Sequence, residues 1–318
     1  MSSHLVVGAT GGIGRASVLA LLKREEKVRI LVRNRRKAEQ YFAGWPPLEI
    51  VEGDAAVAKD VSTAARGVKT LFYCVNVPYP RWRAEVRPLL ATSVEAAARA
   101  GAKLVFPGNV YVYGHAQSVP VGEDHPFAAH TQKGQIRIQM EQHLVEAART
   151  KGLRYTIVRM PDFYGPYVVN GFSEVLVGNA LSGKTVRWLG DLDVPIEFIF
   201  VDDGGEAMVM VGLSDGSDGA SFNVPGAGQT TARLFLSEMI RQAASSSRLT
   251  TLNSNRALAV AGWFNVMAAE LKEMMYLKQE PFLLDGSLFR TTFGSLPCTP
   301  YPEGIRQTLD WRRAFRST

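Results

Sequence analysis

The stretch that decides the fold lies near the N-terminus and reads His4-Leu5-Val6-Val7-Gly8-Ala9-Thr10-Gly11-Gly12-Ile13-Gly14-Arg15. An apolar run is followed at once by spaced glycines, and a second apolar run follows at residues 28–33. This order predicts a strand, a glycine-rich turn, a helix and a second strand, the arrangement that binds a dinucleotide. Gly8 permits the sharp turn, Gly11 lets the backbone approach a pyrophosphate, and Gly14 lets the helix pack against the strand. The free N–H groups and dipole of the helix N-terminus favour the phosphates.

The second strand is predicted to end in Arg33, with Arg35 and Arg36 just beyond it. An acidic residue there holds the ribose 2′-hydroxyl of NAD, whereas arginine suits the 2′-phosphate of NADP. Arg15 could close on that phosphate from the other side and complete a charge-assisted site. For Arg35, Arg36 and Lys37 a solvated helix start is the alternative, and it is favoured for Lys37. We therefore expect NADP, with NAD as the weaker candidate, held by Gly8, Thr10, Gly11, Gly12, Ile13, Gly14, Arg15 and Arg33.

The 318 residues are enough for a Rossmann-type unit with a second, smaller lobe. A hydrophobic content of 46% and a charged content of 21% are ordinary for a globular enzyme. We expect no signal peptide, because the chain passes directly from Ser2 into the first strand, and no membrane span. Cys74 and Cys298 form neither a disulfide framework nor a metal-binding spacing, so a reduced cytoplasm and no metal are expected. Cys74 is interpreted as a core residue.

The formal net charge of +6 could indicate a nucleic-acid partner, but the basic residues are scattered and no nucleic-acid motif is present. Several of them lie where a cofactor phosphate would use them. The expected partner is a small-molecule substrate, without nucleic acid or membrane, in a monomer or homodimer.

Further apolar runs predict strands at residues 48–54, 68–75, 103–106 and 155–159, and helices at 37–42, 84–100 and 132–149. This alternation predicts an α/β fold with a doubly wound parallel sheet, which binds ligands at the carboxyl ends of its strands. Asn76 begins a loop along that edge. A strand entering a helix at 197–203, with Asp202 or Asp203 as cap, and a late strand at 221–224 are expected to return to the sheet. The predicted domains are 1–165, which binds the dinucleotide, and 166–318, a smaller and mainly helical substrate lobe.

Together these features resemble the extended and atypical branch of the short-chain dehydrogenase/reductase superfamily, the NAD-dependent epimerase/dehydratase-like proteins. The matching residues occur in the family's order: the turn at 8–14, Asp54, Val112-Tyr113-Gly114, Arg159 with Tyr164-Gly165-Pro166, and Phe200-Val201-Asp202-Asp203. The resemblance implies a Rossmann domain with a C-terminal substrate lobe. It also implies that Asp54 holds the adenine ring, although a helix N-cap for residues 57–66 is a compatible second role.

The catalytic positions depart from that family. Its active members carry Ser or Thr after the fifth strand, and Asn109 stands there. They also carry Tyr-x-x-x-Lys ahead of a glutamate; aligned on Glu141, these positions are Lys133 and Arg137. In the family the tyrosine supplies the proton, and the lysine lowers its pKa and holds the nicotinamide ribose. A shift of register does not restore the motif, because residues 115–153 contain no tyrosine.

The leading hypothesis is an NADPH-dependent ketoreductase acting on a hydroxylated aromatic, polyketide-like ketone. Its proton would come from Lys133, Tyr111, Tyr113, water or the substrate itself. Asn109 would orient the carbonyl, and Arg137 would take the ribose role of the missing lysine. Asp162, Phe163 and Tyr164 would line the substrate pocket together with Tyr111. The alternatives are a non-catalytic NADP-binding sensor or scaffold, and a sugar-nucleotide epimerase or dehydratase, whose chemistry also relies on the missing tyrosine.

Two further features remain open. His115, His125 and His130 lie in one loop and lack metal-ligand spacing, so they are interpreted as loop residues, one of which could face the substrate. The methionine-rich stretch at 257–277 predicts a helix that forms either lobe core, a dimer face, or an adaptable lid over an apolar substrate.

Overall fold

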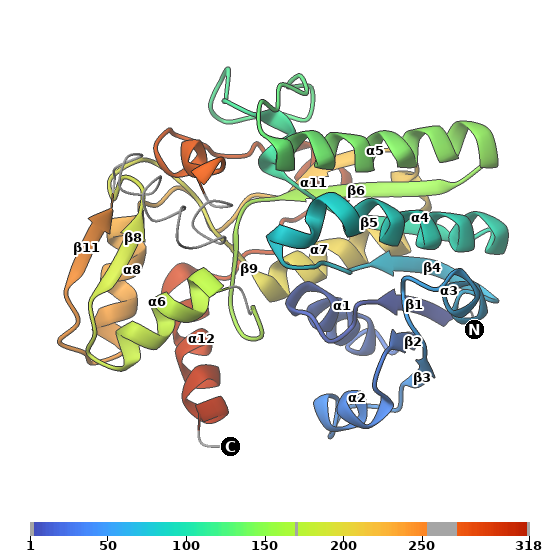
Figure 1. The fold of residues 1–318 in the computed structure, drawn as a ribbon, viewed down its shortest axis with the longest axis horizontal. Coiled ribbons are helices and arrows are strands. Elements are labelled where there is room, and N and C mark those ends of the chain that lie inside the picture. Colours follow the sequence, from blue (N-terminus) through green and yellow to red (C-terminus); the bar gives the residue numbers. More distant parts are fainter. Residues whose placement is uncertain (1–2, 169–170, 253–271, 317–318) are drawn as a thin grey trace.

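The fold is built on a seven-stranded parallel sheet in the order β10-β6-β5-β4-β1-β2-β3 (Figure 1). The computed structural model describes residues 3–168, 171–252 and 272–316. The strands are β1 (Ser3–Val7), β2 (Lys27–Val32), β3 (Glu49–Glu52), β4 (Val68–Tyr73), β5 (Lys103–Asn109), β6 (Arg154–Met160) and β10 (Ser221–Asn223). Strand order reverses between β1 and β4, so the crevice for a ligand lies at their carboxyl ends.

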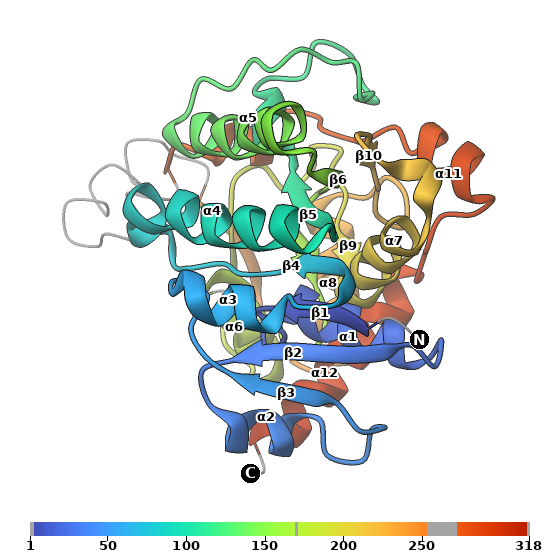
Figure 2. The ribbon, with the colours of Figure 1, turned by 90° about the vertical axis from the view of Figure 1, so that its right-hand side faces the viewer.

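Helices cover both faces of the sheet, as Figure 2 shows. On one face lie α3 (Ala58–Ala64), α4 (Trp82–Ala100) and α5 (Gln132–Lys151), and on the other lie α1 (Gly12–Leu22) and α7 (Val201–Leu213). The helix α2 (Arg35–Tyr41) follows β2, and α11 (Ser287–Phe293) packs on β10. Each face has its own apolar core, because strands buried on both sides present apolar residues in both directions.

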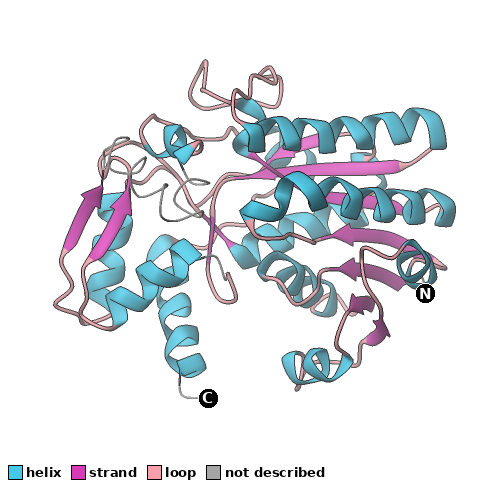
Figure 3. Ribbon diagram, viewed as in Figure 1, coloured by secondary structure: helices cyan, strands magenta, loops and turns pink. Residues whose placement is uncertain are grey.

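A smaller C-terminal region packs beyond the carboxyl ends of the strands (Figure 3). It contains α6 (Gly171–Leu181), α8 (Ala232–Gln242) and α12 (Tyr301–Arg316), with β8 (Val186–Leu189) paired in parallel to β11 (Leu249–Leu252). Its core is separate from the two sheet cores. The short pair of β7 (Phe163–Tyr164) and β9 (Ile199–Phe200) connects it to the sheet.

The predicted fold class is confirmed: α/β, with a parallel Rossmann sheet and a smaller C-terminal region. The late strand joins the sheet as β10, hydrogen-bonded to β6. The C-terminal region also contains the β8–β11 pair, which the sequence pattern did not reveal. Among the described helices, none has the length and apolar character needed to cross a bilayer.

Two predicted helix caps are wrong. The helix α3 has Val57 as its N-cap, because the Asp54 carboxylate instead accepts the Ala56 N–H at 2.9 Å in a turn at the tip of β3. The helix α7 has Phe200 as its N-cap, and both aspartates lie within its first turn. There Asp203 is used to hold the chain before α12, since it accepts the backbone N–H and hydroxyl of Thr299.

The predicted methionine-rich helix at 257–277 lies mostly outside the described residues. Its described end includes Met274 and Tyr276, which are buried in the core beneath α4 and α5. This part of the segment therefore contributes to core packing.

Candidate active site

The glycine-rich turn between β1 and α1 has the geometry of a dinucleotide site. Gly8 has φ +88°, and a Cβ there would lie 2.6 Å from the Cys74 carbonyl oxygen. A Cβ on Gly14 would lie 2.2 Å from the Gly8 carbonyl oxygen, so both positions require glycine. Gly11 differs, because the nearest atom to a Cβ there is 3.5 Å away. Among the described residues no side chain caps α1, which leaves its first turn to bind phosphate. These residues fit the pyrophosphate of a nicotinamide dinucleotide.

The two arginines expected at a 2′-phosphate are in different environments. Arg33 is exposed immediately after β2. The guanidinium of Arg15 instead lies 4.1 Å from the ring centre of Tyr167. That ring also contacts Tyr41 at 4.9 Å and Trp311 at 5.2 Å. Arg15 is therefore part of an aromatic stack that joins α1, α2 and α12, while Arg33 is open to a ligand.

Other predicted cofactor residues lie along the same edge of the sheet. Asn76 is exposed in the loop after β4, and its side-chain oxygen accepts the Val77 N–H at 3.0 Å. Asp54 is partly exposed at the tip of β3. Arg35 pairs with Glu39 on its own helix, which supports the interpretation of a solvated helix start.

The N-terminus of α5 lies against the turn η2 (Val110–Tyr113) that follows β5. Thr131 caps α5 by accepting the Gly134 N–H at 3.1 Å. A Cβ on Gly134 would lie 2.7 Å from the Tyr111 carbonyl oxygen, so glycine allows this close approach. The Asn109 side chain accepts the Tyr111 N–H at 3.2 Å and fixes the turn. These contacts bring Lys133 and Arg137 beside the end of β5.

The loop after β4 also contributes Tyr79 to this region, where the N-terminus of α5 meets the end of β5. The hydroxyl oxygens of Tyr79 and Tyr111 are 2.8 Å apart. The Lys133 ammonium lies 5.0 Å from the ring centre of Tyr79, and the Arg137 guanidinium lies 4.7 Å from the ring centre of Trp82. We call this group the tyrosine–cation cluster: Tyr79, Asn109, Tyr111, Lys133 and Arg137.

Burial controls the protonation of this cluster. It raises the pKa of Tyr79 to about 12 and that of Tyr111 well above its usual value, and the nearby Asp162 charge acts in the same direction. Burial lowers the pKa of Arg137, against the effect of the surrounding tyrosines. Both phenols are therefore protonated at neutral pH. The two phenols of the cluster are therefore hydrogen-bond donors.

Lys133 and Arg137 differ in their partners. Lys133 is buried and forms an ion pair with Glu273, which also accepts the Gln132 N–H at 2.9 Å. Arg137 donates to the Pro107 carbonyl oxygen at 3.3 Å, and its Nε is buried without a hydrogen-bond partner among the described residues. The hydroxyl of Tyr73 at the end of β4 is in the same condition. These unpartnered donors fit the expected role of Arg137 toward a ribose hydroxyl.

Tyr113, expected as a catalytic residue, lies in a different network. Its hydroxyl donates to the Asn223 side-chain oxygen at 2.7 Å and accepts from Arg159 at 3.0 Å. Arg159 also forms a buried ion pair with Glu141 at 2.7 Å. This network ties α5 to β6 and β10. This arrangement differs from the expectation that Tyr113 is catalytic. The Tyr113 hydroxyl is fully buried, and it both donates to Asn223 and accepts from Arg159.

Of the residues expected to line a substrate pocket, some lie at the cluster and others pack into the protein interior. Asp162 lies beside the cluster and pairs with Lys278 at 2.9 Å. Tyr164 is buried in the core of the C-terminal region, against Phe200 and Phe235. Phe163 packs close to Gly204 of α7. The structure therefore brings Asp162 and Tyr111 to the site, whereas Tyr164 is a core residue and Phe163 packs, partly buried, against the sheet core.

Sequence reasoning missed Tyr79 and Glu273. Tyr79 follows β4 in a loop already expected along the cofactor edge, so its position at a strand's carboxyl end was an available signal. Glu273 is far along the chain from Lys133, and no local pattern connects them. Two of the three loop histidines contact each other: His115 pairs with Glu280 at 2.7 Å and stacks on His130, with ring centres 4.4 Å apart. Among the described side chains, no group suited to a metal was found.

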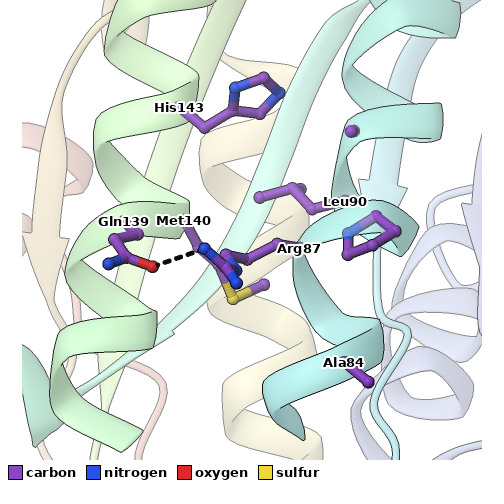
Figure 4. Close-up of a pocket in the computed structure, with 8 residues that line it drawn as sticks. Ala84, Arg87, Leu90, Gln139, Met140 and His143 are labelled. Carbon is purple, nitrogen blue, oxygen red and sulfur yellow. Dashed lines mark hydrogen bonds between the residues drawn. The ribbon is translucent and has the colours of Figure 1, made fainter. Parts of the chain in front are cut away.

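Two cavities lie away from the cluster. One, of about 460 Å³, is a groove between α4 and α5 in which Arg87 donates to Gln139 at 3.0 Å (Figure 4). The other, of about 720 Å³, lies between the end of β10 and α11 and includes Glu197. Neither is lined by a residue of the cluster, so the candidate site rests on the converging strand ends.

Comparison with known proteins agrees with this architecture. The sequence profile of the NAD dependent epimerase/dehydratase family matches residues 4–225. A dTDP-glucose 4,6-dehydratase from Neisseria meningitidis is 26% identical over 53% of this chain and 46% of its own length. A UDP-glucose 4-epimerase from Mycolicibacterium smegmatis is 29% identical over 53% of this chain and 59% of its own length. The matched region thus spans about half the length of these curated relatives.

Solved structures extend the likeness to the whole fold. The dTDP-glucose 4,6-dehydratase DesIV from Streptomyces venezuelae, solved with NAD, superimposes with a TM-score of 0.80 at 22% identity, covering 99% of this chain and 98% of that one. A UDP-glucose 4-epimerase from Thermotoga maritima gives a TM-score of 0.78 at 16% identity, with 99% of each chain covered. At these identities the superpositions describe the fold alone. Because the family profile matches more than half of its length, the chain belongs to the NAD-dependent epimerase/dehydratase family of extended short-chain dehydrogenases/reductases.

Proposed function

We propose that this protein is an NADPH-dependent reductase of a small-molecule ketone. The observation that carries this proposal is the tyrosine–cation cluster, which places proton donors at the strand ends next to the dinucleotide turn. Reduction of a ketone needs an acid beside the carbonyl oxygen. The cluster contains phenols that remain protonated at neutral pH, as that role requires.

The glycine-rich turn would hold the pyrophosphate and Arg33 the 2′-phosphate. Arg137, whose Nε is buried without a described partner, would reach the nicotinamide ribose. The bound nicotinamide would supply the hydride. Asn109 would orient the substrate carbonyl with its amide hydrogens, because its side-chain oxygen already accepts from Tyr111. The cations would stabilise negative charge as it develops on the carbonyl oxygen.

The same cluster is poorly suited to the reverse direction. Oxidation of a secondary alcohol needs a base to take the hydroxyl proton, and a phenol whose pKa is raised is a weak source of phenolate at neutral pH. Lys133, the other candidate base, is engaged in an ion pair with Glu273. These features support reduction as the working direction.

The surroundings of the cluster suggest an aromatic ketone. Tyr79 packs edge-on against Trp82 at 5.2 Å, and the Trp82 ring lies 6.3 Å from that of Tyr111. Trp82 and Tyr111 are buried and support the half-buried Tyr79 ring, which would offer a stacking surface to an aromatic substrate. A ketone with a neighbouring hydroxyl could also share its internal proton. Hydroxylated aromatic ketones are therefore the first class to test.

A sugar-nucleotide epimerase or dehydratase is the second candidate, and the named activities of the curated relatives favour it. That chemistry begins with the oxidation of a secondary alcohol, so it would require a base other than the absent helix tyrosine. It predicts turnover of UDP- or dTDP-glucose with no net consumption of the dinucleotide.

The purified protein should therefore be assayed in two arms. Loss of NADPH absorbance is measured with a panel of hydroxylated aromatic ketones, and product formation is measured chromatographically with UDP-glucose and dTDP-glucose. Ketone-dependent oxidation of NADPH is the expected result. Conversion of a sugar nucleotide alone would favour the second candidate. Tight binding of NADP, measured by fluorescence, with no turnover in either arm would favour a non-catalytic sensor or scaffold.

A further inference from the structure

We propose that Tyr79 is the proton donor of this reaction and that Tyr111 supports it from behind. The assignment rests on the proposed ketone reduction. It places the acid on the loop after β4, in place of the tyrosine that the family carries on the helix corresponding to α5.

The hydroxyls of Tyr79 and Tyr111 form a pair in which Tyr79 is the more exposed residue. Tyr79 is half-buried, whereas Tyr111 is only 6% exposed. Their oxygens are 2.8 Å apart, so each can share a proton with the other. Tyr79 is thus the member that a bound ketone can reach, and Tyr111 is the member that can stabilise a phenolate on it.

The position of Tyr79 is fixed by its surroundings. The Trp82 indole N–H donates to the Val77 carbonyl oxygen at 2.8 Å and holds the loop against α4. The Trp82 ring also packs edge-on against Tyr79. A proton donor must be held within hydrogen-bond reach of the reacting atom, and this packing restricts the side chain accordingly.

Two basic side chains of α5, those of Lys133 and Arg137, lie close to the Tyr79 phenol. Lys133 occupies the family's tyrosine position, and its ammonium lies 5.0 Å from the ring centre of Tyr79. The charge of Arg137 lowers the pKa of both Tyr79 and Tyr111, although burial outweighs it. The helix thus still supplies the positive charge that favours a phenolate, while the phenol comes from another element.

The other candidate donors are committed elsewhere. The Lys133 ammonium is paired with Glu273. The Tyr113 hydroxyl is held between Asn223 and Arg159. Tyr79 is the outermost phenol of the described cluster.

The proposed step is balanced as follows. The carbonyl carbon gains a hydride, with its two electrons, from the reduced nicotinamide. The carbonyl oxygen forms a bond to the proton of the Tyr79 hydroxyl, whose O–H bond breaks. The resulting phenolate accepts a hydrogen bond from Tyr111 and regains a proton from water after the alcohol leaves.

The test compares Tyr79→Phe with Tyr111→Phe and with the control Tyr155→Phe, which removes a hydroxyl at the opposite end of the sheet, near the start of β6. With a ketone that the wild type reduces, Tyr79→Phe should lower kcat by roughly 10²–10⁴-fold while NADPH affinity is retained. Tyr111→Phe should lower kcat by about tenfold, which corresponds to loss of one supporting hydrogen bond. Tyr155→Phe should leave kcat unchanged.

A second readout needs no turnover. The affinity of the same ketone for the protein saturated with NADP⁺ is measured by quenching of tryptophan fluorescence. Tyr79→Phe should weaken it by about tenfold, because the carbonyl loses its hydrogen-bond donor.

The outcomes separate the two proposals. If the wild type reduces a ketone and Tyr79→Phe keeps its kcat and its ketone affinity, the Tyr79 assignment is overturned and the reductase function stands. A larger loss in Lys133→Met than in Tyr79→Phe would give the proton to Lys133 and also overturn it. If the wild type reduces no ketone in the panel, the reductase function itself is overturned.

Discussion

The glycine-rich turn after β1 and the tyrosine–cation cluster after β4 and β5 lie at the same edge of one sheet, yet they relate to their family in opposite ways. The turn keeps the family's residues at each position that the backbone needs. At the cluster, Asn109, Lys133 and Arg137 stand where the resemblance implies the family's serine or threonine, its tyrosine and its lysine. Phosphate binding here depends on backbone N–H groups and close packing, which only glycine permits. A proton can come from any element that reaches the substrate, so its source is free to move.

Gly14→Ala is the strongest way to break the turn. Its Cβ would lie 2.2 Å from the Gly8 carbonyl oxygen, a backbone atom that cannot move aside cheaply. We expect the free energy of unfolding to fall by about 3–5 kcal/mol, within the range for severe core disruption. Dinucleotide binding should be lost as well. Urea denaturation and NADPH fluorescence titration measure the two effects.

Gly11→Ala is the matched control, because a Cβ there meets its nearest atom at 3.5 Å. It should retain most of the stability and lose dinucleotide affinity alone, since the new methyl group lies where phosphate would approach. Equal loss of stability in both variants would contradict the distinction between a packing glycine and a ligand-facing glycine.

Arg33→Asp tests the 2′-phosphate site. The dissociation constant for NADP should rise by roughly 10–100-fold, in line with loss of a charge-assisted contact, while that for NAD changes little. Lys27→Asp makes a similar charge change at the amino end of β2 and should alter neither. A parallel rise for NAD and NADP in Arg33→Asp would remove Arg33 from the phosphate site.

Arg15→Met should have a smaller effect of another kind. Because Arg15 stacks on Tyr167, we expect a loss of about 1 kcal/mol in unfolding free energy, typical of a cation–π contact. The ratio of NADP to NAD affinity should stay close to that of the wild type. A collapse of that ratio would show that Arg15 leaves the stack to bind the phosphate.

The smallest expected effect is an absence of change with pH. Burial raises the pKa of Tyr79 to about 12, so the phenol stays protonated below that value and loses its proton only as the pH rises through it. The kcat for ketone reduction should therefore show no alkaline decline between about pH 6 and about pH 9. A decline within this range, measured under saturating substrate, would indicate a different acid.

The same contrast explains which parts of the structure could be predicted from the sequence. The strand order and the turn follow from short-range patterns, the apolar runs and the spacing of Gly8, Gly11 and Gly14. The departure from the family's triad was expected from the sequence, because Asn109, Lys133 and Arg137 stand at the positions that the resemblance assigns to it. The proposed replacement for the triad could not be predicted from the sequence, because it depends on contacts between residues far apart in the chain, such as Tyr79 with Tyr111 and Lys133 with Glu273.

Local chemistry alone was also misleading at several positions. Tyr113 and Tyr164 are polar aromatics near strand ends, a pattern that suits a pocket, yet long-range packing places both in cores. Arg15 follows the third glycine, a suitable place for a phosphate ligand, and its guanidinium also stacks on Tyr167, a contact that the local pattern does not reveal. In each case the deciding partner comes from another part of the chain.

The ion pair between Glu141 and Arg159 has a consequence for how such a site can change over generations. It holds the middle of α5 to β6, and Thr131 and Gly134 hold its first turn, so these contacts add to the hydrogen bond from Arg137 to Pro107 in fixing the helix. We therefore expect substitutions at 137 to alter the chemistry of the site more than the register of α5. Under the proposed function, change at the proton donor is thereby separated from the risk of unfolding, and such a fold could lose one donor and recruit another.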